Sequence, residues 1–145
     1  EFTFVGGGAY AGRLRDLSDK YIPFSYVGVV SATESAQINA DYNWALLPIE
    51  DEVTRYAFPS KSSSYVFSGA NILAVCGEHT AVAQWVNENR VGLVVDPEVE
   101  SVVAALFDIE KGVYEGLSNE SSREALKVKL RFEVFIEALD SIVLG

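Results

Sequence analysis

Short apolar runs alternate with longer amphipathic stretches along this chain, and the alternation predicts strands followed by helices. The runs rich in β-branched and aromatic residues predict strands at 2–5, 24–30, 44–47, 72–75 and 92–95. Apolar residues at helical spacing predict helices at 9–21, 31–41, 59–69, 80–89 and 99–107. The acidic, irregular stretch 49–58 predicts a loop.

Local signals fix two of these helix boundaries. Ser31 followed by Glu34 matches a capping box, in which each residue satisfies a backbone N–H of the other. Pro59 suits the first turn of a helix and Gly69 suits its end.

A C-terminal helical segment is expected over 118–145. Ser121 with Glu124 repeats the capping-box pattern and predicts one long helix from there to residue 143. Gly116 and Asn119 predict a hinge-like turn before it. The apolar stripe of this helix is expected at Leu126, Leu130, Phe135 and Leu139.

Fivefold alternation of strand and helix requires crossover connections, which favours an α/β fold. We expect a Rossmann-like, doubly wound parallel sheet of about five to six strands with helices on both faces, ending in the long C-terminal helix. The strands are continuous apolar runs, as expected where both faces of a sheet are covered. Ligands bind outside the carboxyl ends of such strands, so candidate chemistry is sought directly after each strand.

Composition and net charge exclude some classes of protein. The chain has 145 residues, 49% of them hydrophobic and 22% charged, which fits one globular domain. Its 11 basic and 21 acidic residues give a net charge of −10, which argues against nucleic-acid binding and a polybasic membrane patch. No stretch reaches the roughly 18–20 apolar residues of a membrane span.

Few residues are available for metal or covalent chemistry. The single cysteine, Cys76, excludes an internal disulfide, and we expect it to be a buried, inert thiol. The single histidine, His79, is expected to be a polar group at a helix start. The carboxylates of Glu50, Asp51 and Glu52 are expected to be solvated, so no metal site and no cofactor are predicted.

Two segments are candidates for binding a phosphate group. Gly6, Gly7 and Gly8 follow a strand and precede a helix, where backbone N–H groups can approach an anion, although a plain tight turn is the alternative. The other segment opens a helix and contains Arg55, Phe58, Pro59, Ser60 and Lys61. Its hydroxyl and two cations suit a phosphate at a helix N-terminus, and the alternative is a pair of solvated surface cations.

The order of these elements resembles the donor-binding, C-terminal domain of GT-B-fold glycosyltransferases, and most closely the retaining family-four group of bacterial surface-polysaccharide enzymes. The matching pieces cover about residues 2–110. In the first half they are the strand and glycine turn at 4–8, the strand at 26–30 and the run 38–48. In the second half they are the Pro-Ser-Lys segment from Phe58, followed by Tyr65 and Gly69, and the strand and turn at 92–97.

The resemblance implies a nucleotide-diphosphate sugar as substrate, with the sugar moved to a glycan or lipid-linked acceptor in O-antigen or capsule synthesis. The diphosphate would be held by the Pro-Ser-Lys segment and the glycine turn. The base would face the strand end at Val27, Gly28, Val29, Val30 and Ser31. The family's ribose-binding glutamate is replaced by Ser64, with Glu50 or Glu52 as alternatives for that role.

The chain is expected to be one donor-binding domain, 1–145, of a longer protein, because it has no methionine and starts at Glu1. The resemblance implies that an acceptor-binding domain carrying the catalytic residues, and one strand preceding the first, lie outside it. The fragment alone is therefore expected to be inactive, and its exposed sheet edge to favour self-association. The full-length protein is expected in the cytoplasm, peripheral at the inner membrane.

Two other functions remain open at this stage. A nucleotide-sugar epimerase of the same fold would bring several histidines into the cleft, and only His79 is present. A flavodoxin-like signalling receiver needs acids after its first strand and an aspartate after its third, where this chain has Gly6 and Pro48.

Overall fold

The computed structural model describes residues 1–115 and 120–144, and in them it has eight helices and two small parallel sheets. The expected α/β class is confirmed. The chain divides into two compact units, Glu1–Asp41 and Tyr42–Gly145, and each is described by itself.

The first unit is a two-stranded parallel sheet with two helices. In chain order it consists of β1 (Phe2–Val5), α1 (Ala11–Lys20), β2 (Phe24–Gly28) and α2 (Ala32–Ala40). Phe2 pairs with Phe24, and the register shifts by one residue between Phe4 and Val5. Helix α1 packs on β2. No residue of this unit is buried.

The second unit is a three-stranded parallel sheet, ordered β3-β4-β5, with six helices in its described part. Its elements are β3 (Trp44–Pro48), α3 (Asp51–Thr54), α4 (Lys61–Ser68), β4 (Asn71–Val75), α5 (Ala81–Asn89), β5 (Gly92–Val95), α6 (Val99–Glu110), α7 (Glu120–Lys129) and α8 (Phe132–Leu144). Trp44 lies opposite Asn71, and Ile72 lies opposite Gly92.

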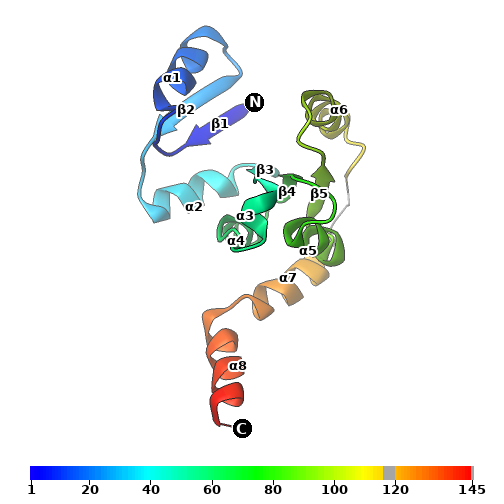
Figure 1. Cartoon of the computed structure of the whole chain (residues 1–145). Helices are drawn as coiled ribbons and strands as arrows, with labels where there is room; N and C mark the ends of the chain where they lie inside the picture. The colour runs from blue at the N-terminus through cyan, green and yellow to red at the C-terminus, as the bar shows by residue number, and fades with distance from the viewer. Residues whose placement is uncertain (116–119, 145) are drawn as a thin grey trace. The chain divides into compact units, whose positions relative to one another are not determined.

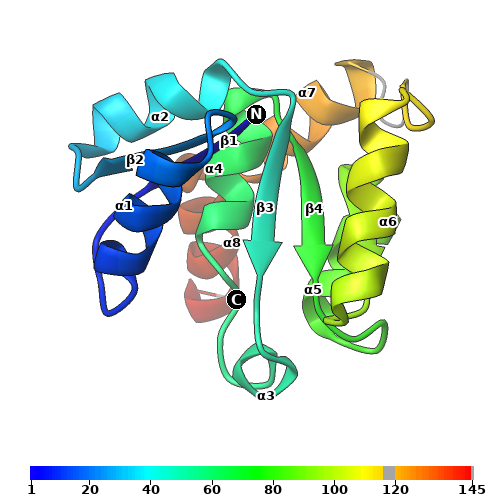
Figure 2. The same cartoon turned by 90° about the horizontal axis from the view of Figure 1, so that it is seen from above.

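Helices cover both sides of this second sheet. Helices α4 and α5 lie on one face with α7 packed against them, and α6 lies on the other side, over β5 (Figure 1, Figure 2). The core fills the space under α4 and α5. Its buried members are Leu47, Val66, Ile72, Ala74, Cys76, Val82, Ala83, Val86, Val91 and Leu126. All the buried hydrophobic side chains that the structure describes belong to this unit.

The predicted start of α2 and end of α4 are confirmed, whereas Pro59 precedes the N-cap residue Ser60 and does not lie in the first turn of α4. The Ser31 hydroxyl accepts from the Glu34 N–H at 3.2 Å, and the Glu34 carboxylate accepts from the Ser31 N–H at 2.9 Å. Gly69 ends α4 with a φ of 91°, a left-handed conformation that glycine adopts without strain.

Three expectations about elements were wrong. The stretch 49–58 contains a short helix, α3, because Asp51 and Glu52 stabilise a helix N-terminus. The long C-terminal helix is two helices, broken at Leu130 and Arg131. Ser121 lies inside α7 and is not its cap, because the helix begins at Glu120. The predicted hinge at Gly116 and Asn119 lies outside the described residues.

The five strands pair as two sheets, of two and three strands. The larger, doubly wound sheet of five to six strands therefore stays a prediction. Among the described helices, none combines the length and the apolar character needed to cross a bilayer.

Candidate functional site

The glycine turn is tied to the end of β2 within the first unit. The Gly6 N–H donates to the Gly28 carbonyl at 2.7 Å, and the Tyr26 hydroxyl donates to the Gly6 carbonyl at 2.8 Å. Gly6 and Gly8 have φ values of 136° and 138°, which side chains rarely adopt. A Cβ on Gly7 would lie 2.9 Å from the Val29 side chain. The turn therefore has little tolerance for residues larger than glycine.

A hollow of about 240 Å³ lies over this turn. Its lining includes the three glycines of the turn, the aromatic residues Phe4, Tyr10 and Tyr26, and the aliphatic residues Val5 and Leu14. The N-cap of α1 is Tyr10, which makes no side-chain hydrogen bond to the helix, and the first turn of α1 contains no acidic residue. The backbone N–H groups at this helix start have no acidic or capping side chain competing for them.

The strand end predicted to face a base lies beside the glycine turn. Val27 and Val29 are exposed, at 49% and 82%. The Ser31 hydroxyl is already engaged, since it also lies 2.7 Å from a carboxylate oxygen of Glu34. Gly28 and Val29 are therefore the residues of this segment that contact the turn, and Ser31 serves α2.

The Pro-Ser-Lys segment opens α4 in the second unit. Ser60 is the N-cap and makes no side-chain cap, and the first turn of α4 contains no acidic residue. The side chains of Arg55, Ser60 and Lys61 are exposed, and no ion pair is recorded for either cation in the described part of the chain. Both cations are therefore available to an anion at this helix start.

Packing fixes where this segment lies. The Phe58 ring meets the Trp85 ring of α5 edge to face, with centroids 5.3 Å apart. The buried Ser62 donates its hydroxyl to the Pro59 carbonyl at 2.6 Å and so closes the first turn of α4. Ser64, the residue predicted to bind ribose, is exposed one turn further along the helix.

A hydrogen bond joins the loops after β3 and β4. The Gly77 N–H donates to the Asp51 carboxylate at 2.7 Å, and a Cβ on Gly77 would collide with that carboxylate. The sequence predicts a solvated Asp51 carboxylate. In the structure this carboxylate also has a hydrogen-bond partner within the protein. Sequence reasoning could not find this pair, because 26 positions separate its members.

Cys76, at the end of β4, is fully buried, as expected. The Thr80 hydroxyl donates to its sulfur at 3.3 Å. Burial, with a smaller contribution from the nearby Asp51 charge, raises the pKa of the thiol, although the Thr80 hydrogen bond opposes the rise. A raised pKa disfavours the reactive thiolate.

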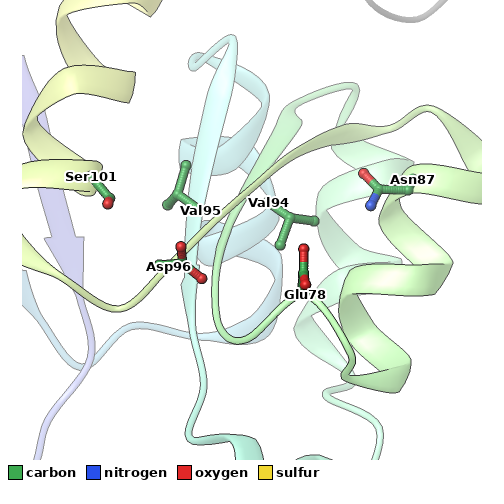
Figure 3. Close-up of a pocket in the computed structure, with 6 residues that line it drawn as sticks. All are labelled: Glu78, Asn87, Val94, Val95, Asp96 and Ser101. Carbon is green, nitrogen blue, oxygen red and sulfur yellow. The ribbon is translucent and has the colours of Figure 1, made fainter.

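A second hollow, of about 390 Å³, lies at the carboxyl ends of β4 and β5. Figure 3 shows Glu78 and Asn87 beside Val94, and Asp96 and Ser101 on the side of Val95. His79 Nε2 lies 3.2 Å from the Glu78 carboxylate, and both side chains are exposed. The only signal for this hollow was the position of Glu78 and Asp96 directly after strands. The described residues contain no group of three or more histidine, cysteine or acidic side chains placed to hold a metal ion.

The predicted site residues thus form two groups. The first unit brings Gly6, Gly7 and Gly8 together with Gly28 and Val29. The second unit places the segment 55–64 at the start of α4. Neither group contains a residue that lines the hollow at the carboxyl ends of β4 and β5. Comparison with known proteins adds no relative to this picture: no protein-family model, no curated protein and no solved structure gives a significant match to the chain.

Proposed function

We propose that the chain is the donor-binding half of a glycosyltransferase, which moves a sugar from a nucleotide-diphosphate sugar to a glycan or lipid-linked acceptor. One observation carries the proposal. Of the six helices α1 to α6, only α1 and α4 begin with neither a side-chain cap nor an acidic residue in the first turn. These are the two helix starts at which the sequence predicts a diphosphate.

Uncapped helix starts suit a diphosphate for two reasons. First-turn N–H groups that lack an intrahelical partner can donate to an anion, and the helix dipole adds a partial positive charge. One N–H in each first turn already donates to a backbone carbonyl, Ala11 to Gly8 and Ser62 to Pro59. In a chain with a net charge of −10, an acid-free helix start is also a place where an anion meets less repulsion. At α4, Lys61 and Arg55 add full charges and Ser60 adds a hydroxyl.

The remaining donor contacts are those that the resemblance implies. Ser64 would hydrogen-bond the ribose, one turn along α4. The backbone of Val27 to Val30 would face the base, because the Ser31 side chain is engaged in capping α2. Stabilising the leaving diphosphate is the main catalytic contribution expected of such a half-site. Neither a metal nor a cofactor is invoked.

The proposed fold is a doubly wound sheet with the strand order 3-2-1-4-5-6. If one strand precedes β1, as the resemblance implies, β2 and β1 would take positions one and two and β3-β4-β5 would take positions four to six; the observed pairs support this order. The third position is then not held by any of these five strands. The strand edges next to it would remain open, which is our reason for proposing self-association through an edge.

The biological setting of the proposal is bacterial surface-polysaccharide synthesis, such as O-antigen or capsule. The enzyme would work in the cytoplasm, with the full-length protein at the inner membrane. The acceptor and the catalytic residues would belong to a further domain.

Nucleotide binding tests the proposal. Uridine and guanosine diphosphates are titrated by calorimetry against the wild type and against Lys61→Ala. We expect the dissociation constant of the better ligand to rise at least tenfold in the variant, about 1.4 kcal/mol, because a charge-assisted phosphate contact is lost.

Lys111→Ala is the matched control, since Lys111 is an exposed lysine at the other end of a helix, α6, and its loss changes the net charge equally. Its affinity should equal that of the wild type. If neither nucleotide binds, or if both variants lose affinity alike, a diphosphate site at α4 is excluded.

A further inference from the structure

The segment 49–58, which leads from β3 toward α4, is exposed along most of its length. It contains the short helix α3, which lies beyond the end of β3 (Figure 2), and it carries Arg55, one of the two cations of the proposed diphosphate site. Only Ile49 and Thr54 of this segment are half-buried, and the other side chains are exposed. A segment with so little packing depends on its hydrogen bonds to stay in one position.

Three contacts tie the segment to the rest of the second unit. At its start, the Ile49 N–H donates to the carbonyl of the last residue of β4 at 3.2 Å. At its end, the Phe58 ring packs on α5. Between these ends, the recorded hydrogen bond from residues 50–57 to another part of the described chain is the one that the Asp51 carboxylate accepts from the Gly77 N–H at 2.7 Å. This bond therefore fixes the middle of the segment.

The glycine at position 77 is matched to this carboxylate. A Cβ on Gly77 would collide with the Asp51 side chain, whereas the φ of Gly77 lies outside the positive range that strains other residues. The backbone at this position would therefore accept alanine, and the close approach of the Asp51 carboxylate is what excludes it.

Hydrogen bonds connect this contact to Arg55. The Thr54 hydroxyl donates to the Asp51 carbonyl at 2.6 Å, and the Arg55 N–H donates to the Glu52 carbonyl at 3.2 Å. Arg55 is the C-cap of α3, one turn from Asp51. In the described part of the chain no ion pair is recorded between these two residues, so the carboxylate does not neutralise the guanidinium.

We propose that Asp51 is a positioning residue: its hydrogen bond to Gly77 holds α3 in place and so fixes Arg55 for an anion at the start of α4. The effect on ligand binding rests on the proposed diphosphate site, whereas the hold on α3 is a property of the protein alone. A side chain that is already held in place loses less conformational freedom on binding, which raises affinity. Asp51 would thus favour an anion although its own charge repels one.

Backbone amide NMR relaxation measures the hold on α3 without any ligand. The order parameters of residues 52–57 should be near the rigid value of about 0.85 in the wild type and below about 0.6 in Asp51→Ala. Gly77→Ala displaces the same carboxylate from the other side and should give the same loss. Asp51→Asn keeps an oxygen acceptor for the Gly77 N–H and should restore the wild-type values.

Glu52→Ala is the matched control for these variants. It removes one exposed carboxylate from the same first turn of α3, and no hydrogen bond or ion pair of that carboxylate is recorded in the described part of the chain. Its order parameters should equal those of the wild type. An unchanged urea midpoint by tryptophan fluorescence checks that the second unit stays folded in every variant.

Calorimetric titration of uridine and guanosine diphosphates measures the effect on binding. In Asp51→Ala the dissociation constant of the better ligand should rise about fivefold, the effect of one lost hydrogen bond. Removal of a negative charge near an anion should by itself tighten binding, so the two causes have opposite signs. Glu52→Ala should therefore bind as tightly as the wild type or more tightly, and Asp51→Asn should stay within about twofold of the wild type.

The outcomes separate the role of Asp51 from the proposed function. Rigid order parameters in both Asp51→Ala and Gly77→Ala would overturn the proposal, whether or not a nucleotide binds. Unchanged affinity in Asp51→Ala, when the wild type does bind, would overturn the positioning of Arg55. A wild type that binds neither nucleotide would exclude the diphosphate site, and Asp51 would then hold α3 alone.

Discussion

Arg123 on α7 places a charge within the second unit, where it is only 8% exposed. Its guanidinium donates to the Ala70 carbonyl at 2.8 Å and to the Asn71 side-chain oxygen at 2.6 Å. Burial lowers the pKa of this guanidinium from a value so high that it remains charged at neutral pH. The contacts fix α7 to the start of β4, across more than 50 positions of sequence.

Replacing this arginine with an apolar side chain of similar length should destabilise the second unit. Arg123→Met would leave the buried Ala70 carbonyl without this donor, so we expect the free energy of unfolding to fall by about 2–3 kcal/mol. Urea unfolding followed by tryptophan fluorescence measures it. Arg131→Met makes the same change at an exposed position and should shift stability by less than about 0.5 kcal/mol. Equal losses in the two variants would show that Arg123 is not a structural anchor.

The sequence alone predicted the environment or role of some single residues and not of others. The environment of Cys76 followed from its place at the end of an apolar strand. Lys61 and Arg55 could be singled out because cations are scarce in this part of the chain. The roles of Asp51 and Arg123 could not, because their partners lie far away in sequence and no local pattern marks either residue.

At the scale of elements, the capping box of α2 predicts a pH dependence. Hydrogen bonds from the Ser31 hydroxyl and then from its backbone N–H lower the pKa of the Glu34 carboxyl below its usual 4.5. Because the pKa is depressed in the folded state, the box stabilises α2 above the ordinary carboxyl pKa. That stabilisation is lost as the pH falls through the depressed value.

Nuclear magnetic resonance can follow this titration directly. The Glu34 carboxyl should titrate below pH 4.5 in the wild type, and the α2 amides should exchange faster once it is protonated. In Ser31→Ala the titration should move back toward the ordinary value, because the largest cause of the shift is removed. An unchanged midpoint in that variant would mean that the box does not persist in solution.

The start of α2 and the end of α4 were predictable from a chemical boundary signal, whereas the capping-box pattern at Ser121 did not mark the start of α7. The glycine after α4 and the serine before α2 mark their helices by conformational preference alone. The break between α7 and α8 has neither proline nor glycine at Leu130 and Arg131. Leu130 packs against the core while Phe135 does not, so the stripe expected along one helix is divided by tertiary packing.

At the scale of the whole molecule, the two units differ in how much they bury. All the buried hydrophobic side chains that the structure describes lie in the second unit, and none lies in Glu1–Asp41. Since burial of apolar surface is the main stabilising contribution to folding, the first unit should be the less stable one.

Chemical unfolding should therefore proceed in two stages. Both tryptophans, Trp44 and Trp85, belong to the second unit, so their fluorescence reports on it alone. Far-ultraviolet circular dichroism reports on helices of both units and should begin to fall at a lower urea concentration. Coincident transitions would instead indicate one cooperative domain.

The overall α/β class followed from the strand–helix alternation, because each element has its own periodicity. How the strands pair did not follow, since pairing is a long-range property that depends on which edges meet. The two candidate segments share this limit: each is recognisable from a short stretch of sequence, and they belong to different units of the chain.

The buried thiol of Cys76 can report how often the core of the second unit opens. With one sulfhydryl group in the chain, enclosed between β4 and α5 and held in its protonated form, an alkylating reagent has a single target and can reach it only when the core opens. The rate of alkylation at high reagent concentration is then the rate of opening itself, and at low concentration it gives the open fraction. The packing that makes this cysteine unreactive in the native state therefore also makes it a probe of how often the core opens.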